Sequence, residues 1–186
     1  YMEACAGGFH SVAKRSDGTF VLWGSNYRGQ LDQPSLPPGL SFVDYRMGQN
    51  YAIGFVSDGT IRTWGDVTQW GRNVPWPPPA GTHYVDIDGG VDLCMGLRSD
   101  GEVVVWGRVD AFGSTIPPLP PGLRYIGISA GTYFGAALRS DGQIAAFGLI
   151  AQWPVVVPPL PAGVVYTLVA AGRQVAVAGR SDGTLI

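Results

Sequence analysis

Five aspartates recur at nearly equal intervals along this 186-residue chain, each between a serine and a glycine: Asp17, Asp58, Asp100, Asp141 and Asp182. Repeated carboxylates could ligate calcium, and a serine beside an aspartate could belong to a Ser-His-Asp triad. Each aspartate lacks the alternating oxygen donors of a calcium loop, and the serine is shared by all five copies. Asp-Gly between two apolar, β-rich runs predicts a hairpin turn. We therefore assign these residues to turns.

The two histidines offer equally little chemistry. Neither His10 nor His83 has the cysteine or carboxylate spacing of a zinc site. His10 is expected to be a packed structural residue, because the same position of the other copies holds Tyr51, Leu93, Phe134 and Val175. His83 lies in a connector and is expected to be solvated. With no phosphate-binding Gly-x-x-x-x-Gly-Lys-Ser/Thr run either, we predict no catalytic residue, metal or cofactor, and hence no enzyme.

The spacing of the Ser-Asp-Gly glycines predicts a repeat architecture. These glycines are Gly18, Gly59, Gly101, Gly142 and Gly183, which are 41, 42, 41 and 41 residues apart. We interpret 1–186 as a single domain with repeats 1–41, 42–83, 84–124, 125–165 and an incomplete 166–186.

Each copy predicts three short antiparallel strands. The first runs from an aromatic residue to an anchor glycine, the second leads into the Asp-Gly turn, and the third ends at Trp-Gly or Phe-Gly. The third strand is apolar on both faces, as in a buried sheet layer. No stretch keeps a 3.6-residue apolar period, so the predicted fold class is all-β. The anchor glycines are Gly7, Gly48, Gly90, Gly131 and Gly172.

One column of the second strand is always alanine or glycine: Ala13, Gly54, Gly96, Ala137 and Ala178. Side chains this small suggest that two packed sheets approach closely, with the bulky Trp column supplying the complementary volume.

Proline-rich connectors of 17 or 18 residues separate each Trp-Gly or Phe-Gly from the next aromatic. A run such as "PPLPPG" cannot donate hydrogen bonds within a central sheet and favours extended geometry. We expect these stiff segments to return the chain to the start of the next sheet. The alternative is that "PPLPP" is a ligand for an SH3-type module.

The composition excludes several classes of protein. The chain is 46% hydrophobic, which suffices for one core, and its net charge of −2 comes without a basic cluster. This balance argues against nucleic acid and anionic membranes as partners, and no 18-residue apolar run is present to span a membrane. Cys5 and Cys94 fall in copies that are not neighbours, so we expect two buried free thiols. Because the chain begins without Met and ends inside a strand, we expect an excerpt of a longer polypeptide.

The first copy, "AGGFHSVAKRSDGTFVLWGSNYRGQL", resembles the repeat of the regulator-of-chromosome-condensation superfamily. That repeat has Gly-x-x-His-Ser before Asp-Gly, then Trp-Gly-x-Asn and Gly-Gln-Leu. The resemblance implies a β-propeller, most often of seven blades, with about one repeat per blade. It extends over the whole chain but says little about function, because the superfamily hosts many activities. The matching residues are Gly7, His10, Ser11, Asp17, Gly18, Trp23, Gly24, Asn26, Gly29, Gln30 and Leu31.

The short period and the proline-rich returns look most like the three-stranded blades of the propeller-type bacterial β-lactamase inhibitor proteins. This likeness implies an exported bacterial protein. Five repeats form either a closed five-bladed ring or part of a larger propeller. The abrupt ends favour the second arrangement.

In a three-stranded antiparallel blade the first turn and the start of the connector lie at the same end, opposite the Asp-Gly turn. This end differs in every copy and is rich in aromatic residues, as expected of a recognition face for another protein. Alternatively, these aromatics cap the blades or pack on the proline runs. The predicted partner-binding residues are Phe9, Asn50, Asp92 and Tyr133 in the turns and Tyr27, Arg28, Trp70, Arg72, Asp110, Phe112 and Trp153 in the connectors.

These features predict a non-catalytic protein-binding scaffold, such as an inhibitor, an adaptor or an assembly subunit. One alternative is a guanine-nucleotide exchange factor for a small GTPase, although the chain has no basic arm for chromatin. Another is a glycan-binding lectin, whose pockets should repeat from blade to blade. The turn column changes in every copy, which argues against the lectin.

Overall fold

The structure is a computed structural model that describes residues 1–67, 77–91, 93–107, 115–150 and 153–186, without the side chains of 149, 150, 153 and 154. In the described residues, antiparallel strands follow one another in sequence order as a series of small sheets. The predicted all-β fold of three-stranded blades is confirmed. Blade 5 has two strands in its sheet, and Leu185 adds an isolated bridge to Gly179.

The strand bounds repeat closely from blade to blade. Blade 1 holds β1 (Glu3–Ala6), β2 (His10–Lys14) and β3 (Phe20–Gly24). Blade 2 holds β4 (Phe42–Met47), β5 (Tyr51–Val56) and β6 (Ile61–Gly65). Blade 3 holds β7 (Tyr84–Gly89), β8 (Leu93–Arg98) and β9 (Val103–Gly107). Blade 4 holds β10 (Tyr125–Ala130), β11 (Phe134–Arg139), β12 (Ile144–Ile150) and β13 (Trp153–Pro154), and blade 5 holds β14 (Tyr166–Ala171) and β15 (Ala176–Arg180).

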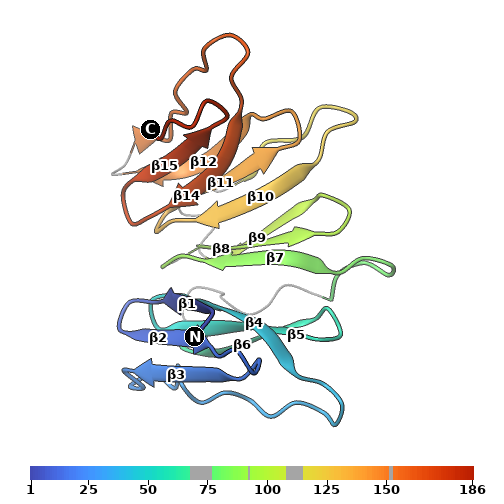
Figure 1. Cartoon of the computed structure of the whole chain (residues 1–186), viewed down its shortest axis with the longest axis vertical. Helices are drawn as coiled ribbons and strands as arrows, with labels where there is room; N and C mark the ends of the chain where they lie inside the picture. Colours follow the sequence, from blue (N-terminus) through green and yellow to red (C-terminus); the bar gives the residue numbers. More distant parts are fainter. Residues whose placement is uncertain (68–76, 92, 108–114, 151–152) are drawn as a thin grey trace.

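The blades form an open arc. The first strands contact one another in the order β1, β4, β7, β10 and β14, so they make the inner row of the arc. Blades 1 and 5 lie at opposite ends of the molecule (Figure 1), and no strand pair joins them within the described residues. The chain therefore adopts the partial-propeller arrangement rather than a closed ring.

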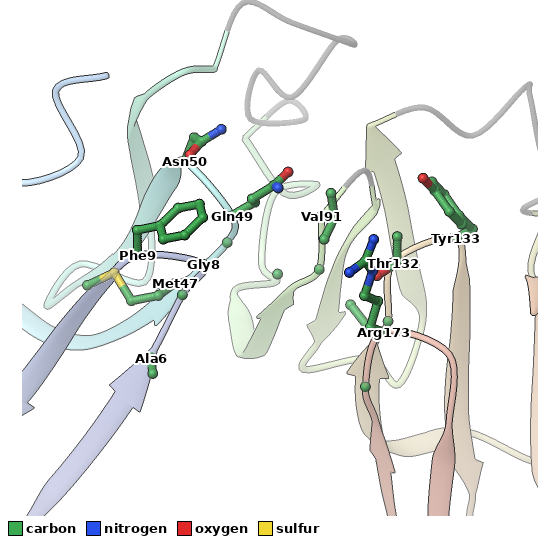
Figure 2. A pocket seen from close by; sticks show the side chains of 17 residues that line it. Ala6, Gly8, Phe9, Met47, Gln49, Asn50, Val91, Thr132, Tyr133 and Arg173 are labelled. Atoms are coloured by element: carbon green, nitrogen blue, oxygen red, sulfur yellow. The ribbon is translucent and has the colours of Figure 1, made fainter. Parts of the chain in front are cut away.

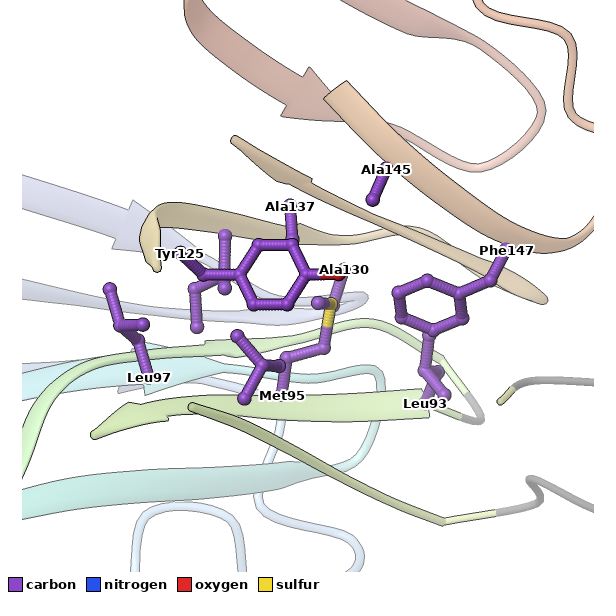
Figure 3. Packing of buried hydrophobic residues seen from close by; sticks show 10 residues of the cluster. Leu93, Met95, Leu97, Tyr125, Ala130, Ala137, Ala145 and Phe147 are labelled. Atoms are coloured by element: carbon purple, nitrogen blue, oxygen red, sulfur yellow. The ribbon is translucent and has the colours of Figure 1, made fainter. Parts of the chain in front are cut away.

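The hydrophobic core lies between blades. Figure 3 shows the joint where Met95 and Leu97 of blade 3 face Tyr125 of blade 4. Burying a side chain of this size stabilises the fold by roughly 1.5–3 kcal/mol. Met95 is 0% exposed, whereas Val177 at the same position of blade 5 is 38% exposed. The outer face of blade 5 therefore carries joint residues without a neighbouring blade on them.

The column of small residues has a different cause from the one expected. A Cβ at Gly54 would lie 2.5 Å from the Phe42 ring and 3.1 Å from Trp64. At Gly96 the same clashes would come from Tyr84 at 2.7 Å and Trp106 at 3.3 Å. The small residue makes room for two aromatic rings of its own blade, not for a neighbouring sheet. The Trp column does supply the complementary volume.

The connectors return along the blades as expected. In the connector between blades 3 and 4, Ile116 and Leu119 pack against the core of that joint. The Tyr125 hydroxyl donates a hydrogen bond to the Pro117 carbonyl over 2.8 Å. Part of the "PPLPP" run is thus engaged within the chain.

The Asp-Gly turns satisfy their own hydrogen bonds. The Asp17 carboxylate accepts from the Thr19 amide at 2.9 Å and from its hydroxyl at 2.7 Å. These bonds hold the pKa of Asp17 below its ordinary value. In blades 3 and 4 the turn aspartate pairs with an arginine beside the turn: Arg98 pairs with Asp100, and Arg139 pairs with Asp141.

The serine and glycine of several Ser-Asp-Gly turns bind neighbouring segments. The Ser140 hydroxyl accepts a hydrogen bond from the Arg124 amide at 3.2 Å, which fixes the end of the connector. The Gly101 carbonyl accepts from the Tyr125 amide of the next blade at 2.9 Å. Gly101 has φ +85°, a conformation that favours glycine. The repeated triplet is therefore a structural element.

Candidate first-turn groove

A groove of about 590 Å³ runs across the first-turn end of the arc (Figure 2). All five blades contribute the end of the first strand, the anchor glycine or the residues that follow it. Its described lining is Ala6, Gly7, Gly8, Phe9, Met47, Gly48, Gln49, Asn50, Gly89, Gly90, Val91, Ala130, Gly131, Thr132, Tyr133, Gly172 and Arg173. We call it the first-turn groove.

The anchor glycines form the floor of the groove because neighbouring backbones touch there. A Cβ at Gly7 would lie 2.2 Å from the Gly48 carbonyl oxygen, and one at Gly90 would lie 1.7 Å from that of Gly131. A Cβ at Gly131 would lie 2.6 Å from the Gly172 carbonyl oxygen. Only glycine allows this approach at these three anchors, whereas at Gly48 a Cβ would instead meet the Tyr51 ring of its own blade.

Hydrogen bonds beneath the floor tie successive blades together. The Asp88 carboxylate accepts from the Ala130 amide at 2.8 Å and from the Ser129 hydroxyl at 3.0 Å. The Ser129 hydroxyl in turn accepts from the Ala171 amide at 2.9 Å. We call this chain of bonds across blades 3 to 5 the inter-blade latch. It stiffens the strands that position the groove.

In blade 2 an arginine stands where the latch residue would be. The Arg46 guanidinium lies 2.7 Å from Asp44 and 3.5 Å from Asp86. Burial raises the pKa of Asp86 above its ordinary value, although the charge of Arg46 opposes this. A guanidinium has no acceptor atom, so Arg46 cannot accept a hydrogen bond from an amide of the next blade as Asp88 does. It connects β4 and β7 by charge instead.

His10 is the packed structural histidine that the sequence predicts. It is buried beside the groove floor, where its Nε2 lies 3.2 Å from the Tyr51 carbonyl oxygen. Burial lowers the pKa of His10. Tyr51, at the same position of blade 2, donates to the Gly90 carbonyl at 2.7 Å. This column supports the floor from below.

The side chains around the groove are mixed in character. Phe9 is 71% exposed, and Asn50 and Tyr133 are half-buried. Arg173 is exposed and supplies a positive charge, and the described lining contains no carboxylate. This combination can bind an uncharged or acidic segment of extended chain.

Among the described side-chain atoms that are buried without a hydrogen-bond partner, the Thr132 hydroxyl is the one that belongs to a residue lining the groove. The residue is 3% exposed, and in the described part of the structure its Oγ1 has no hydrogen bond. A buried polar atom left unpaired costs about 1–3 kcal/mol. Because no bond within the described structure offsets this cost, we attribute the unpaired hydroxyl to a functional role of the groove.

The structure gathers only some of the predicted site residues. Phe9, Asn50 and Tyr133 line the groove. Tyr27 and Arg28 lie at the start of the first connector, as predicted, but are not among the residues that line the groove. There the Arg28 guanidinium stacks over the Tyr27 ring at 5.2 Å. Arg28 also lies 3.8 Å from Asp66. Outside the described residues are Trp70, Arg72, Asp92, Asp110 and Phe112, together with the side chain of Trp153.

The predicted sharing of one end by the first turn and the connector is confirmed. The Ser25 amide, at the start of the connector, donates to the Phe9 carbonyl at 2.8 Å. The Asp66 amide donates to the Asn50 carbonyl at 2.9 Å in the next blade. Connector starts and first turns are thus hydrogen-bonded to each other.

A second variable column, which was not predicted from the sequence, lies directly after the anchor glycines. It holds Gly8, Gln49, Val91, Thr132 and Arg173, and all of these line the groove. The signal was available, because this position differs in every copy as the following one does.

Within the described ranges, no cluster of three or more His, Cys, Asp or Glu side chains could hold a metal ion. The same residues include no helix with the length and apolarity needed to cross a membrane. Neither Cys5 nor Cys94 is in a disulfide within the described structure. Cys94 is buried as expected, with its Sγ 3.0 Å from the Tyr51 hydroxyl, whereas Cys5 is half-buried.

Known structures share this architecture. A crystal structure of yeast RCC1 (Prp20) bound to Kap60 matches with a TM-score of 0.75 and 21% identity, covering 98% of this chain and 54% of that one. A structure of Prp20p from Saccharomyces cerevisiae, described with its binding properties to Gsp1p and histones, gives 0.75 and 21%, covering 98% and 55%. The CRINKLY WD40 ectodomain of the Arabidopsis thaliana receptor kinase ACR4 gives 0.72 and 21%, covering 98% and 67%.

This likeness shows that the fold is an RCC1-like β-propeller. The chain spans about half the length of the yeast structures that it matches. No protein-family model matches the sequence, and no curated protein does so either.

Proposed function

We propose that this chain is a non-catalytic protein-binding scaffold whose partner docks on the first-turn end. The observation that carries the proposal is the first-turn groove itself. The side chains that line it change from blade to blade, whereas the opposite end repeats the Asp-Gly turn, whose aspartate is hydrogen-bonded within the turn. Variable side chains on a fixed frame suit the recognition of one particular partner.

The character of the groove also supports a protein partner. Exposed Phe9 and half-buried Tyr133 offer aromatic anchors, and Arg173 adds a residue type common in binding hot spots. The groove is unlike a repeated sugar pocket, because no two blades present the same pair of side chains there.

The relatives in fold are consistent with this role. Yeast RCC1 was crystallised with Kap60, and its second structure is described with binding to Gsp1p and histones. Those partners belong to that protein. For this chain, an inhibitor role like that of the propeller-type bacterial inhibitor proteins is one form of the proposal, and an adaptor or assembly subunit is another.

Guanine-nucleotide exchange on a small GTPase is the second candidate, favoured by the fold shared with yeast RCC1 and its description with Gsp1p. Exchange activity would appear as accelerated release of bound nucleotide from a captured GTPase. A partner that binds without such release supports the scaffold instead.

The test is capture of the partner from the native source by two matched variants. The first, Phe9→Ser with Tyr133→Ser, removes both aromatic anchors of the groove. The control, Glu102→Ser with Gln143→Ser, changes two exposed side chains beside the Asp-Gly turns. We expect the first pair to lose the partner and the control to retain it. If the first pair retained the partner and the control lost it, the partner would bind the Asp-Gly end and the proposal would be wrong.

A further inference from the structure

We propose that the first-turn groove binds an acidic side chain, aspartate or glutamate, carried on an extended segment of the partner protein. The Arg173 guanidinium and the Thr132 hydroxyl are the donors to its carboxylate. The inference rests on the proposed function and names the chemistry of the partner at that same groove.

Arg173 is a cation that the described structure leaves without a counter-charge. Four arginines lie within 4.0 Å of an aspartate, namely Arg28, Arg46, Arg98 and Arg139. Among the described arginines without such a neighbour, Arg173 is the one that lines the groove. Arg173 has no such neighbour among the described residues and extends from an exposed turn into the groove lining. A guanidinium binds a carboxylate through two parallel hydrogen bonds, so it suits an acidic side chain.

Thr132 provides the second, independent observation. It holds the position of blade 4 that Arg173 holds in blade 5, and the anchor glycines before them, Gly131 and Gly172, are in contact. Figure 2 shows both side chains at the same side of the groove. The Thr132 hydroxyl is buried without a partner in the described part of the chain. Side chains occupy three staggered rotamers, so rotation about the Cα–Cβ bond can turn this donor toward a ligand.

The remainder of the groove fits an extended peptide better than a phosphorylated ligand. One guanidinium matches the single charge of a carboxylate, whereas phosphate sites usually gather several cations or a nest of amides. The glycine floor is flat, and Gln49 and Asn50 offer amides that can pair with a peptide backbone. Phe9 and Tyr133 flank it with apolar surface.

The test is a titration of the ¹⁵N-labelled protein with the blocked peptide acetyl-Ala-Glu-Ala-amide, followed by NMR. The glutamine analogue, acetyl-Ala-Gln-Ala-amide, is the matched ligand. We expect saturable shifts at Gln49, Thr132 and Arg173, with the glutamine peptide weaker by about tenfold, the change that one charged hydrogen-bond pair gives.

Two variants of the protein separate the roles of the donors. Arg173→Gln should weaken the glutamate peptide by about tenfold, while Arg124→Gln, which removes the same charge at the Asp-Gly end, should leave its affinity unchanged. Thr132→Val should lower affinity without lowering the melting temperature, because the hydroxyl has no partner in the described structure. A purely structural threonine would give the opposite pattern.

Several results would overturn the inference. They are equal affinity for the two peptides, equal effects of Arg173→Gln and Arg124→Gln, or no saturable shift with either peptide. The proposed function is judged separately by partner capture. If Arg173→Gln still captures the partner and the Phe9→Ser, Tyr133→Ser pair does not, the recognition face stands and the acidic ligand is rejected.

Discussion

The two ends of the blades differ in how fully their polar groups are used. At the Asp-Gly end every turn aspartate accepts hydrogen bonds within its turn, and four of the five turn serines accept one from the connector. At the first-turn end the described structure leaves the Thr132 hydroxyl unpaired and Arg173 without a counter-ion. The repeated turn residues are therefore largely saturated, whereas the variable lining of the groove holds groups that are available to a ligand. The arginines beside the Asp-Gly turns are an exception, because the Arg180 Nε is buried without a partner and Arg124 has no counter-ion among the described residues.

The largest expected loss of stability comes from substituting an anchor glycine, which tests whether the floor of the first-turn groove is tightly packed. Gly90→Ala would place a Cβ 1.7 Å from the Gly131 carbonyl oxygen, so the joint between blades 3 and 4 must open. We expect a loss of about 3 kcal/mol in the free energy of unfolding, measured with urea. The matched glycine is Gly18, where a Cβ meets nothing within 4 Å and only the φ of +83° is unfavourable.

Gly18→Ala should therefore cost only about 1–2 kcal/mol. If it were as damaging as Gly90→Ala, the account of the glycine floor would be wrong.

The next effect concerns the inter-blade latch beneath the groove. Asp88→Ala removes the acceptor of the Ala130 amide and leaves that amide unpaired. We expect a loss of about 1–3 kcal/mol in the free energy of unfolding. Asp88→Ser supplies the kind of hydroxyl that Ser129 already uses toward Ala171, and it should restore part of the loss. Equal stability of the alanine and serine variants would argue against the latch.

A smaller effect compares one hydroxyl from each end. Ser140→Ala removes the acceptor of the Arg124 amide and should destabilise the fold by about 1 kcal/mol. Thr132→Val removes a hydroxyl without a partner in the described structure and should leave the free energy of unfolding unchanged or slightly higher. Thermal unfolding of both variants decides the matter, and a larger loss for Thr132→Val would reverse the contrast between the ends.

The smallest effect is the pH dependence of the Asp-Gly end. Bonds from the Thr60 hydroxyl and amide lower the pKa of Asp58 from 3.8, so the folded state favours its charged form. This stability is present above pH 3.8 and is lost as the pH falls through the lower folded value. Asp58→Asn should flatten the acid limb of a stability profile measured by urea unfolding.

Asp86 makes the opposite contribution. Burial raises its pKa, so the folded state favours the neutral acid, and stability decreases as the pH rises from 3.8 through the raised value. Asp86→Asn should remove that decrease. An unchanged profile in both variants would show that neither carboxylate is coupled to folding.

The sequence predicts what depends on repeated local chemistry. The Asp-Gly spacing gives the period, the turns and the three-stranded blade, and strand direction alone places Phe9, Asn50 and Tyr133 at one end. Contacts between blades were less accessible. In the latch, Asp88 of one copy and Ser129 of the next both accept a hydrogen bond from a backbone amide of the following blade. The sequence does not reveal this shared role, because the residue type changes.

The placement of Tyr27 and Arg28 away from the groove was also beyond the sequence. It depends on how the connector folds back, where the Gln30 side chain accepts from the Arg28 amide at 2.7 Å. The stacking of the anchor glycines likewise follows from the distance between blades, which no local pattern encodes.

Hydrogen–deuterium exchange on the complex with the captured partner tests the recognition face most directly. We predict that binding slows amide exchange at residues 7–9, 48–50 and 131–133 and leaves residues 16–19, 99–102 and 140–143 unchanged. Protection confined to the second set would contradict the central claim, because the partner would then cover the saturated Asp-Gly end.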